Sequence, residues 1–396
     1  MLQNPRVVLL NHKADAVKRF HPWIFSGAIK FKEKTVQENA LVDAVDEKGN
    51  FLATGYYSNG SIAVRVLSFR PVASLESLFA KRIHQAWQLR TQVGLAHSNA
   101  TNAFRLINAE GDGIPGLIVD FYNGTAVLQA HAPFIYAHRE LIAKQLAEVL
   151  QERLQAVYCK SEATLGRKSG MQVSDGYLFG SSTQSTVSEN NLLFEVDWQE
   201  GQKTGFFLDQ RDNRQLLGDY SVGKKVLNTF CYTGGFSVYA LANEAELVHS
   251  VDSSEKAIVL TDKNVQRNFG NELRHRSYAK DVFDFLKESE DQFYDLIILD
   301  PPAFAKGHGA RHQAVQAYKR LNQMAFSKIK SGGLIFTFSC SQAVGPELFE
   351  GAVMAGAIEA QRNIKILHHL AQPADHPQSV FHSEGLYLKG LVLFVA

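Results

Sequence analysis

Residues 226–236 read VLNTFCYTGGF, and this stretch decides the fold of the C-terminal half. An apolar strand ends in a turn of small residues with two adjacent glycines, and a helical pattern follows. Ligands of open parallel sheets bind beyond the carboxyl ends of the strands, and glycine lets a ligand approach the backbone closely. The stretch therefore predicts a ligand site at a strand end; a strand-to-helix turn without a ligand is the alternative.

Acidic residues follow the next two segments of the pattern. Asp252 comes directly after the apolar run 247–251, and Asp281 follows residues 277–280. A carboxylate at a strand end can accept hydrogen bonds from both hydroxyls of a ribose. The loop lacks the second and third glycines of the dinucleotide fingerprint, so no pyrophosphate cradle is expected. NAD and S-adenosylmethionine both remain compatible with it.

Strands and helices alternate from about residue 192, which predicts a parallel sheet covered on both faces, an α/β fold. A hairpin of residues 192–198 and 204–208 precedes the alternation, and 386–395 is expected as an added edge strand. The expected strands are 226–230, 247–251, 294–299, 333–338 and 364–368, and the expected helices are 234–243, 254–268, 312–330 and 344–360.

The N-terminal half divides into two further regions. Asn59-Gly60 lies between apolar runs and predicts a hairpin, because the type I′ turn needs positive φ at both central residues. Residues 1–72 are expected to form a small β-domain and 73–190 an α+β middle domain with a second hairpin at 117–130. The third domain is then 191–396. The sequence Gly111–Gly116 matches GxGxxG, but it contains Pro115 and runs into a hairpin strand, so a turn is expected there.

Composition excludes several classes of protein. Lys and Arg number 41 and Asp and Glu 40, so the net charge of +1 excludes a polycation, although the first 34 residues carry a net +5. Three cysteines in 396 residues argue against a disulfide framework and favour a reducing, cytoplasmic location. No run approaches a signal peptide or a membrane span, and no histidine or cysteine spacing predicts a metal site.

The segment 300–304 reads DPPAF and ends an apolar strand. Prolines hold the chain extended and donate no hydrogen bonds, so their carbonyls are free to accept from an exocyclic amine. Asp300 can bond a ring nitrogen or move a proton, and Phe304 can stack on a base. The alternative is a plain loop.

Cys340 lies in the polar sequence Ser339-Cys340-Ser341 after the next strand. A thiol at the carboxyl end of a strand beside the cofactor crevice is placed for nucleophilic catalysis. A small buried cysteine without a catalytic role is the alternative. Cys231 lies in the glycine loop and is expected to line the cofactor, and Cys159 is expected in the core of another domain.

These motifs, in this order, resemble those of class I S-adenosylmethionine-dependent methyltransferases. The segment 201–214, GQKTGFFLDQRDNR, is more specific and resembles bacterial ribosomal large-subunit RNA cytosine-5 methyltransferase I. Residues 18–29 and 104–117 are similar to the opening of that family's RNA-binding PUA domain and to its middle domain. Many other RNA cytosine-5 methyltransferases carry a second Cys where this chain has Pro302, a difference that supports the narrower family.

The resemblance implies a Rossmann-like catalytic domain, S-adenosylmethionine as cofactor and a set of site residues. Catalysis is expected from Cys340, as the nucleophile that adds to C6 of cytosine, and from Asp300. The expected cofactor-binding residues are Asn228, Phe230, Gly234, Asp252, Asp281, Asp300, Lys203, Phe207, Gln210 and Arg214. The expected substrate-binding residues are Pro301, Pro302, Phe304, Lys18, Arg19 and Lys30.

The predicted function is methylation of cytosine C5 in large-subunit ribosomal RNA, free or in an assembly intermediate. The sequence leaves the oligomeric state open, with a homodimer as one candidate. A methyltransferase acting on nitrogens of guanine or adenine is the first alternative, because the DPPAF motif also fits it; Cys340 discriminates the two. The second alternative is a non-catalytic RNA-binding module, against which the three acids Asp252, Asp281 and Asp300 argue.

Overall fold

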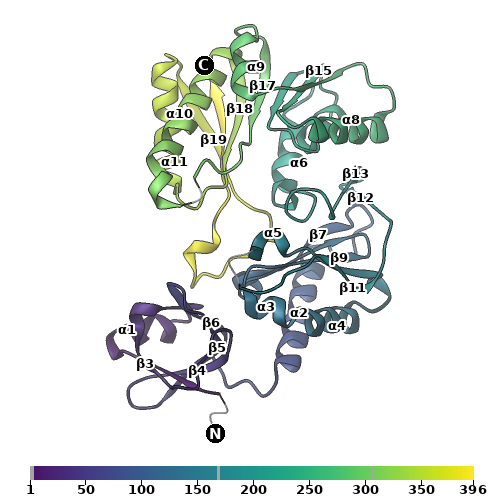
Figure 1. The fold of residues 1–396 in the computed structure, drawn as a ribbon. Coiled ribbons are helices and arrows are strands. Elements are labelled where there is room, and N and C mark those ends of the chain that lie inside the picture. The colour runs from purple at the N-terminus through teal and green to yellow at the C-terminus, as the bar shows by residue number, and fades with distance from the viewer. Residues whose placement is uncertain (1–3, 167–169, 306) are drawn as a thin grey trace. The chain divides into compact units, whose positions relative to one another are not determined.

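A computed structural model gives the fold and describes residues 4–166, 170–305 and 307–396. The chain forms two compact units (Figure 1). The first contains residues 1–185, 197–206 and 374–385, and the second contains 186–196, 207–373 and 386–396. The short segments 197–206 and 374–385 therefore belong to the first unit, although the residues on either side of each belong to the second.

A six-stranded sheet in the order β2-β6-β5-β4-β1-β3 begins the first unit. The Asn59-Gly60 hairpin is confirmed, since β5 and β6 pair antiparallel on either side of it. The elements are β1 (Arg6–Leu9), α1 (Asn11–Lys18), β2 (Trp23–Phe25), β3 (Ile29–Lys32), β4 (Leu41–Val45), β5 (Phe51–Tyr57) and β6 (Ile62–Ser68).

A second sheet of the first unit has the order β11-β10-β9-β8-β7. The second hairpin is confirmed, because Asn123 and Gly124 both have positive φ between β8 and β9. The GxGxxG match is confirmed as a turn between β7 and β8, with Gly113 left-handed. The elements are α2 (Leu75–Gln92), β7 (Ala103–Asn108), β8 (Leu117–Tyr122), β9 (Thr125–Ala130), α3 (Pro133–Ala137), α4 (Arg139–Leu150), β10 (Ala156–Cys159), α5 (Glu162–Leu165) and β11 (Gly176–Gly180).

The second unit contains a seven-stranded sheet in the order β16-β15-β14-β17-β18-β20-β19, which confirms the α/β fold. The first five strands in this order are parallel, and β20 pairs antiparallel with both β18 and β19. The added strand at the C-terminus is therefore present, but its expected edge position is wrong, because β19 forms the edge of the sheet. In Figure 1, α9, α10 and α11 lie on one side of the sheet and α6 and α8 on the other. The strands are β14 (Lys225–Thr229), β15 (Leu247–Asp252), β16 (His275–Ala279), β17 (Tyr294–Leu299), β18 (Ile329–Ser339), β19 (Ile364–Leu370) and β20 (Lys389–Val395).

The sequence analysis missed some elements of this unit. Its helices are α6 (Arg211–Asp219), α7 (Gly235–Ala242), α8 (Glu255–Phe269), α9 (Val282–Glu288), α10 (Arg311–Lys328) and α11 (Pro346–Glu359), of which α6 and α9 were not expected. The expected hairpin of 192–198 with 204–208 is wrong: β13 (Leu192–Glu195) pairs with β12 (Thr186–Glu189) instead. Asn190-Asn191, both with positive φ, supply the tight turn between them.

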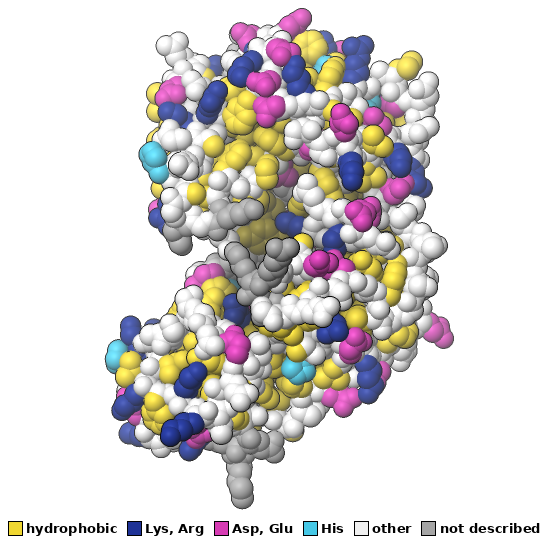
Figure 2. Space-filling model, viewed as in Figure 1, with side chains coloured by type: hydrophobic (Ala, Val, Ile, Leu, Met, Phe, Trp, Pro, Cys, Tyr) yellow, Lys and Arg dark blue, Asp and Glu magenta, His cyan; other side chains and the backbone are white. Residues whose placement is uncertain are grey.

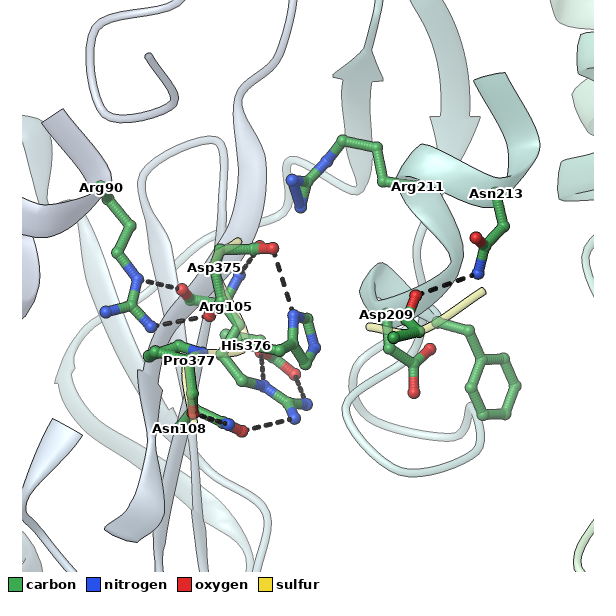
Figure 3. A network of polar contacts seen from close by, with 12 residues as sticks. Arg90, Arg105, Asn108, Asp209, Arg211, Asn213, Asp375, His376 and Pro377 are labelled. Carbon is green, nitrogen blue, oxygen red and sulfur yellow. Dashed lines mark hydrogen bonds and ion pairs between the residues drawn. The ribbon is translucent and has the colours of Figure 1, made fainter. Parts of the chain in front are cut away.

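Residues 374–385, which connect β19 and β20 in sequence, belong to the first unit. Figure 3 shows how buried polar groups hold this segment. Arg90 pairs with Asp112 at 2.6 Å and donates to the Asp375 carbonyl at 2.7 Å, while the Arg105 backbone N–H donates to the Asp375 carboxylate at 2.8 Å. The Asn108 amide donates to the Pro377 carbonyl at 3.0 Å. Such satisfied buried networks fix a segment in one conformation.

The division into three domains at residues 72/73 and 190/191 stays a prediction. The two N-terminal sheets both belong to the first compact unit, so the two units do not test a boundary between these sheets. In the part of the chain that the structure describes, no helix is long and apolar enough to cross a membrane.

Candidate active site

The carboxyl ends of the central strands lie at one edge of the sheet. Thr229 of β14 is in register with Val251 of β15 and with Leu299 of β17, and Leu299 is in register with Thr337 of β18. The glycine loop, Asp252, Asp300 and Cys340 each follow one of these strand ends. Parallel register therefore brings the motifs, which the sequence separates by more than 100 residues, to the same edge of the sheet.

The turn after β14 requires its glycine. Gly234 is the N-cap of α7 with φ of 74°, and a Cβ there would lie 2.6 Å from Cγ2 of Thr261. Phe230 and Tyr232 also have positive φ, so the loop is sharply bent at three places. Strained loop backbone of this kind is typical of ligand sites.

Asp252 stabilises the same loop. One carboxylate oxygen accepts from the Tyr232 backbone N–H at 3.0 Å, and the other accepts from the Ser254 N–H at 2.9 Å. The residue is half-buried, and an ionised carboxylate has about four acceptor sites. Its chemistry therefore fits the predicted binding of ribose hydroxyls.

Asp281 follows β16 as the N-cap of α9, where its side chain accepts from the N–H groups of Phe283 and Asp284. This contact gives the residue a structural reason to be acidic. The side chain is exposed, and its role toward the cofactor stays a prediction.

Asp300 is oriented by a chain of side-chain amides. The Asn213 amide donates to the Gln210 carbonyl oxygen at 2.6 Å, and the Gln210 amide donates to the Asp300 carboxylate at 3.0 Å. Gln210 and Asn213 are buried, and both belong to the segment 207–214 at the start of α6. This chain of hydrogen bonds holds the Asp300 carboxylate in one orientation.

Cys340 differs from the other two thiols in exposure: it is partly exposed, whereas Cys159 and Cys231 are buried. Burial raises the pKa of both buried thiols. The loop that carries Cys340 is tied to the loop that carries Asp300, because the Ser341 hydroxyl donates to the Ala305 carbonyl at 2.9 Å. Of the three cysteines, Cys340 is thus the one whose surroundings suit nucleophilic chemistry.

The residues of the DPPAF loop differ from one another in solvent exposure. Pro301 is buried and Pro302 exposed. The Phe304 ring packs against Tyr318 of α10 with centroids 4.8 Å apart, so part of it belongs to the core. Stacking of Phe304 on a base stays a prediction for its remaining exposed surface.

The other predicted cofactor residues have the following contacts. Arg214 is buried in an ion pair with Glu189 at 2.7 Å, and it also donates to the Phe207 carbonyl at 2.9 Å. The Phe207 ring packs edge-on against Tyr232 of the glycine loop. Asn228 is buried and donates to Ser237 at 2.9 Å. Contacts within the protein thus engage Arg214 and Asn228, and their cofactor roles stay predictions.

Four of the predicted residues lie in the first unit. Lys203 is exposed, with φ of 49°. Lys18, Arg19 and Lys30 are exposed at the end of α1 and in β3. Lys18 pairs with Asp15 at 3.4 Å and Lys30 with Glu47 at 2.8 Å, while Arg19 has no acidic partner among the described residues. Exposed aromatic rings of Phe20, Phe25 and Phe31 accompany these cations.

Two residues near Cys340 were missed in the sequence analysis. Lys389 begins β20 and donates to the Ser341 carbonyl at 2.7 Å. Tyr318 of α10 is buried, and burial raises its pKa to about 12, with the charges of Cys340 and Asp300 acting in the same direction. In the sequence, Lys389 could have been noticed as a lysine that directly precedes an apolar run.

Two protein families match parts of this chain. The S-adenosylmethionine-dependent methyltransferase family matches residues 173–392, and the PUA-like domain family matches residues 7–69. S-adenosylmethionine is therefore the cofactor of this fold, and the part of the chain before residue 70 is PUA-like. Both expectations from the sequence are confirmed.

Solved structures share the whole fold. A candidate S-adenosylmethionine-dependent methyltransferase from Streptococcus mutans is similar over 99% of this chain and 100% of its own, with a TM-score of 0.84 and 24% identity. Another methyltransferase candidate, solved with SAH, has a TM-score of 0.85, also at 24% identity. At this identity the likeness concerns the fold.

Curated relatives are more similar in sequence. Ribosomal RNA large subunit methyltransferase I of Alteromonas mediterranea is 38% identical over 392 residues, 98% of each chain. The protein of the same name from Escherichia coli is 35% identical over 97% of this chain and 98% of its own. The chain therefore belongs to the ribosomal RNA large subunit methyltransferase I family of S-adenosylmethionine-dependent methyltransferases.

Proposed function

We propose that this protein methylates C5 of a cytosine in large-subunit ribosomal RNA through a covalent bond between Cys340 and C6 of the base. The class of RNA follows from the names of the relatives. The observation that carries the chemistry is the partly exposed thiol of Cys340 at the end of β18, on a loop tied to that of Asp300. A methyltransferase acting on an amine nitrogen needs no such thiol.

Covalent catalysis is required because C5 of a neutral cytosine is a weak nucleophile. The Cys340 thiol first loses its proton to solvent, and the thiolate forms a bond with C6. The electron pair of the C5–C6 double bond becomes available at C5, which attacks the methyl carbon. S-adenosylmethionine would supply that methyl group from a positively charged sulfur, whose bond to the methyl carbon breaks so that the sulfur leaves as a neutral thioether. A base then removes the C5 proton, the double bond re-forms, and the bond between C6 and sulfur breaks to release Cys340.

Asp300 is assigned to the N3 edge of the base in this mechanism. Addition of the thiolate places negative charge on the ring, and a hydrogen-bonding group at N3 stabilises it. The amide chain from Asn213 through Gln210 holds the Asp300 carboxylate in one orientation, which reduces the cost of reorganisation. The residue that removes the C5 proton is left unassigned.

The cofactor is assigned to the loop after β14 and to Asp252. The sharp backbone of that loop and the half-buried carboxylate fit a nucleoside with two ribose hydroxyls. Asn228, Phe230, Gly234 and Asp281 are proposed to line the same site.

The PUA-like sheet is proposed to hold the RNA backbone. Figure 2 shows Lys and Arg side chains over the region of α1, β3 and β4, with hydrophobic side chains between them. Lys18, Arg19 and Lys30 would neutralise phosphates, and the exposed phenylalanines offer faces for base stacking. The candidate homodimer stays a prediction.

A covalent trap tests the mechanism. Large-subunit RNA in which 5-fluorocytosine replaces cytosine is incubated with the protein and S-adenosylmethionine, and the products are separated under denaturing conditions. Fluorine cannot leave C5 as a proton does, so we expect a protein–RNA adduct that maps to Cys340 by mass spectrometry. Cys231→Ala and Cys159→Ala should still form the adduct. Methylated guanine or adenine as product, with no adduct, would contradict the proposal.

A further inference from the structure

Lys389 is a buried lysine at the start of an apolar strand. Its side chain lies on β20, in register with Ser339 of β18, and the residue is 7% exposed. Its ammonium donates to the Ser341 carbonyl at 2.7 Å, and no carboxylate of the described residues lies within ion-pair distance of it. A buried ammonium is costly unless a negative charge compensates for it, so a single neutral carbonyl is an incomplete partner.

The missing negative charge can come from Cys340. Lys389 is the cross-strand neighbour of Ser339, and its ammonium hydrogen-bonds the Ser341 carbonyl, so the lysine pairs with one residue that flanks Cys340 through the backbone register and with the other through its side chain. Burial lowers the pKa of Lys389, and attraction to the Cys340 thiolate acts in the opposite direction. Interaction between two groups is mutual, so an ammonium that a thiolate stabilises also stabilises that thiolate.

Other charged or titratable groups face the same region. Asp300 follows β17, and the Tyr318 hydroxyl belongs to α10; the charges of Asp300 and Cys340 both act on Tyr318, and as acids neither Asp300 nor Tyr318 supplies positive charge. Beside Lys389, a groove of about 240 Å³ is also lined by the exposed His369 and the half-buried Glu350, which pair with each other at 3.4 Å. Among these groups, Lys389 is the buried cation.

We propose that the ammonium of Lys389 stabilises the thiolate form of Cys340 and, through the Ser341 carbonyl, fixes the loop that carries it. The inference rests on the proposed function, since a thiolate is needed only if Cys340 is a nucleophile. Lys389 keeps its proton throughout and transfers none: the thiol proton goes to solvent, and the ammonium acts by its charge. It is a positioning and charge-stabilising residue rather than a nucleophile or a base.

The test measures the thiol directly, without RNA. In a Cys159→Ala, Cys231→Ala background, the rate of Cys340 alkylation by iodoacetamide is followed from pH 5 to 10. The alkylation rate is proportional to the fraction of thiolate, so an ordinary thiol reaches half of its maximal rate at about pH 8.5. We expect the midpoint for Cys340 to lie at least about one pH unit lower. A midpoint at or above 8.5 in this protein overturns the proposal before any lysine is changed.

Two substitutions separate charge from hydrogen bonding. Lys389→Met removes both, and Lys389→Gln keeps a donor for the Ser341 carbonyl without the charge. We expect both to reduce alkylation at pH 7 about tenfold or more, which is a shift of at least about one pH unit in the midpoint. Calorimetric binding of S-adenosylmethionine checks that the variants are folded. An unchanged midpoint in Lys389→Gln would overturn the charge role and leave Lys389 as a structural donor.

Lys328→Met is the matched control. Lys328 is also a buried lysine that donates to a backbone carbonyl, that of Ser289 at 2.7 Å, but it lies next to the opposite end of β18 and, unlike Lys389, pairs with a carboxylate, that of Asp291 at 2.7 Å. We expect its removal to leave the Cys340 midpoint unchanged; an equal shift would overturn the proposal as a general effect of losing a buried cation. A shift confined to Lys389 variants, with no 5-fluorocytosine adduct in the unsubstituted protein, would instead reject the proposed function.

Discussion

The loops after β14 and β18 leave the same edge of one sheet, and each places a cysteine directly beyond a strand end. Cys231 is 6% exposed, lies 3.7 Å from the Thr261 hydroxyl and has a pKa raised by burial. Cys340 is partly exposed, and the Lys389 ammonium donates to the carbonyl of the next residue, Ser341. The same topological position thus gives a buried thiol in one loop and a partly exposed residue in the other. The roles proposed for the two cysteines follow this difference in burial rather than their position on the sheet.

The largest expected difference between the two loops is in the rate of methylation. Cys340→Ala should lower kcat on the order of 10⁴-fold or more, because a missing nucleophile leaves only binding and electrostatic contributions. The kcat of the Cys231→Ala variant should stay within about tenfold of that of the unsubstituted protein. Transfer of a labelled methyl group to large-subunit RNA measures both, and equal losses would erase the contrast.

The loop after β14 should instead control the cofactor. Asp252→Ala should weaken S-adenosylmethionine binding by about 1–3 kcal/mol, the range for hydrogen bonds to a charged group. Asp284→Ala is the control, since Asp284 is exposed and pairs with Lys287. Calorimetry measures both affinities. An unchanged dissociation constant in Asp252→Ala would move the ribose elsewhere.

The shape of the β14 loop can be tested through its glycine. Gly234→Ala should lower the free energy of unfolding by about 2 kcal/mol, from the left-handed backbone and from the contact with Thr261. Gly223 has a similar φ of 65° but no atom within 4 Å of an added Cβ, so Gly223→Ala should cost about 1 kcal/mol. Denaturant unfolding compares the two, and equal costs would show that Thr261 yields without penalty.

The smallest effect is expected outside both loops, in the PUA-like sheet. Replacing Lys18, Arg19 and Lys30 with Gln should weaken RNA binding and reduce the slope of log affinity against log salt by up to about 2, at roughly 0.7 per phosphate contact with single strands. Cofactor affinity should not change. The control replaces three exposed lysines of α8 and α9, Lys256, Lys263 and Lys287. Equal slopes in the two triple variants would mean that the PUA-like cations do not contact phosphates.

Local signals predicted much of the fold. Both Asn-Gly hairpins form, but only Asn123-Gly124 has positive φ at both residues; Asn59-Gly60 lies in a four-residue connection between β5 and β6 without positive φ, so the expected type I′ turn is wrong there. The strand β17 was predicted with its observed ends because four apolar residues, 296–299, follow one another at its carboxyl end. The helix α6 was missed because its sequence, RDNRQLLGD, is mostly polar, although five of its residues are buried. The strand β16 was missed for a related reason: HRSYA has no apolar run, and an edge strand needs none.

The sequence by itself determined the order of the motifs, the alternation that makes a parallel sheet and the residues at the strand ends, because these depend on short-range patterns. The tertiary structure decided which of them meet. The contact of Gln210 with Asp300 joins residues 90 apart, and that of Lys389 with Ser341 joins residues 48 apart. It also decided that Arg214 is engaged by Glu189 and that Cys231 is buried. Burial and long-range charge depend on packing between distant segments, which no local pattern encodes.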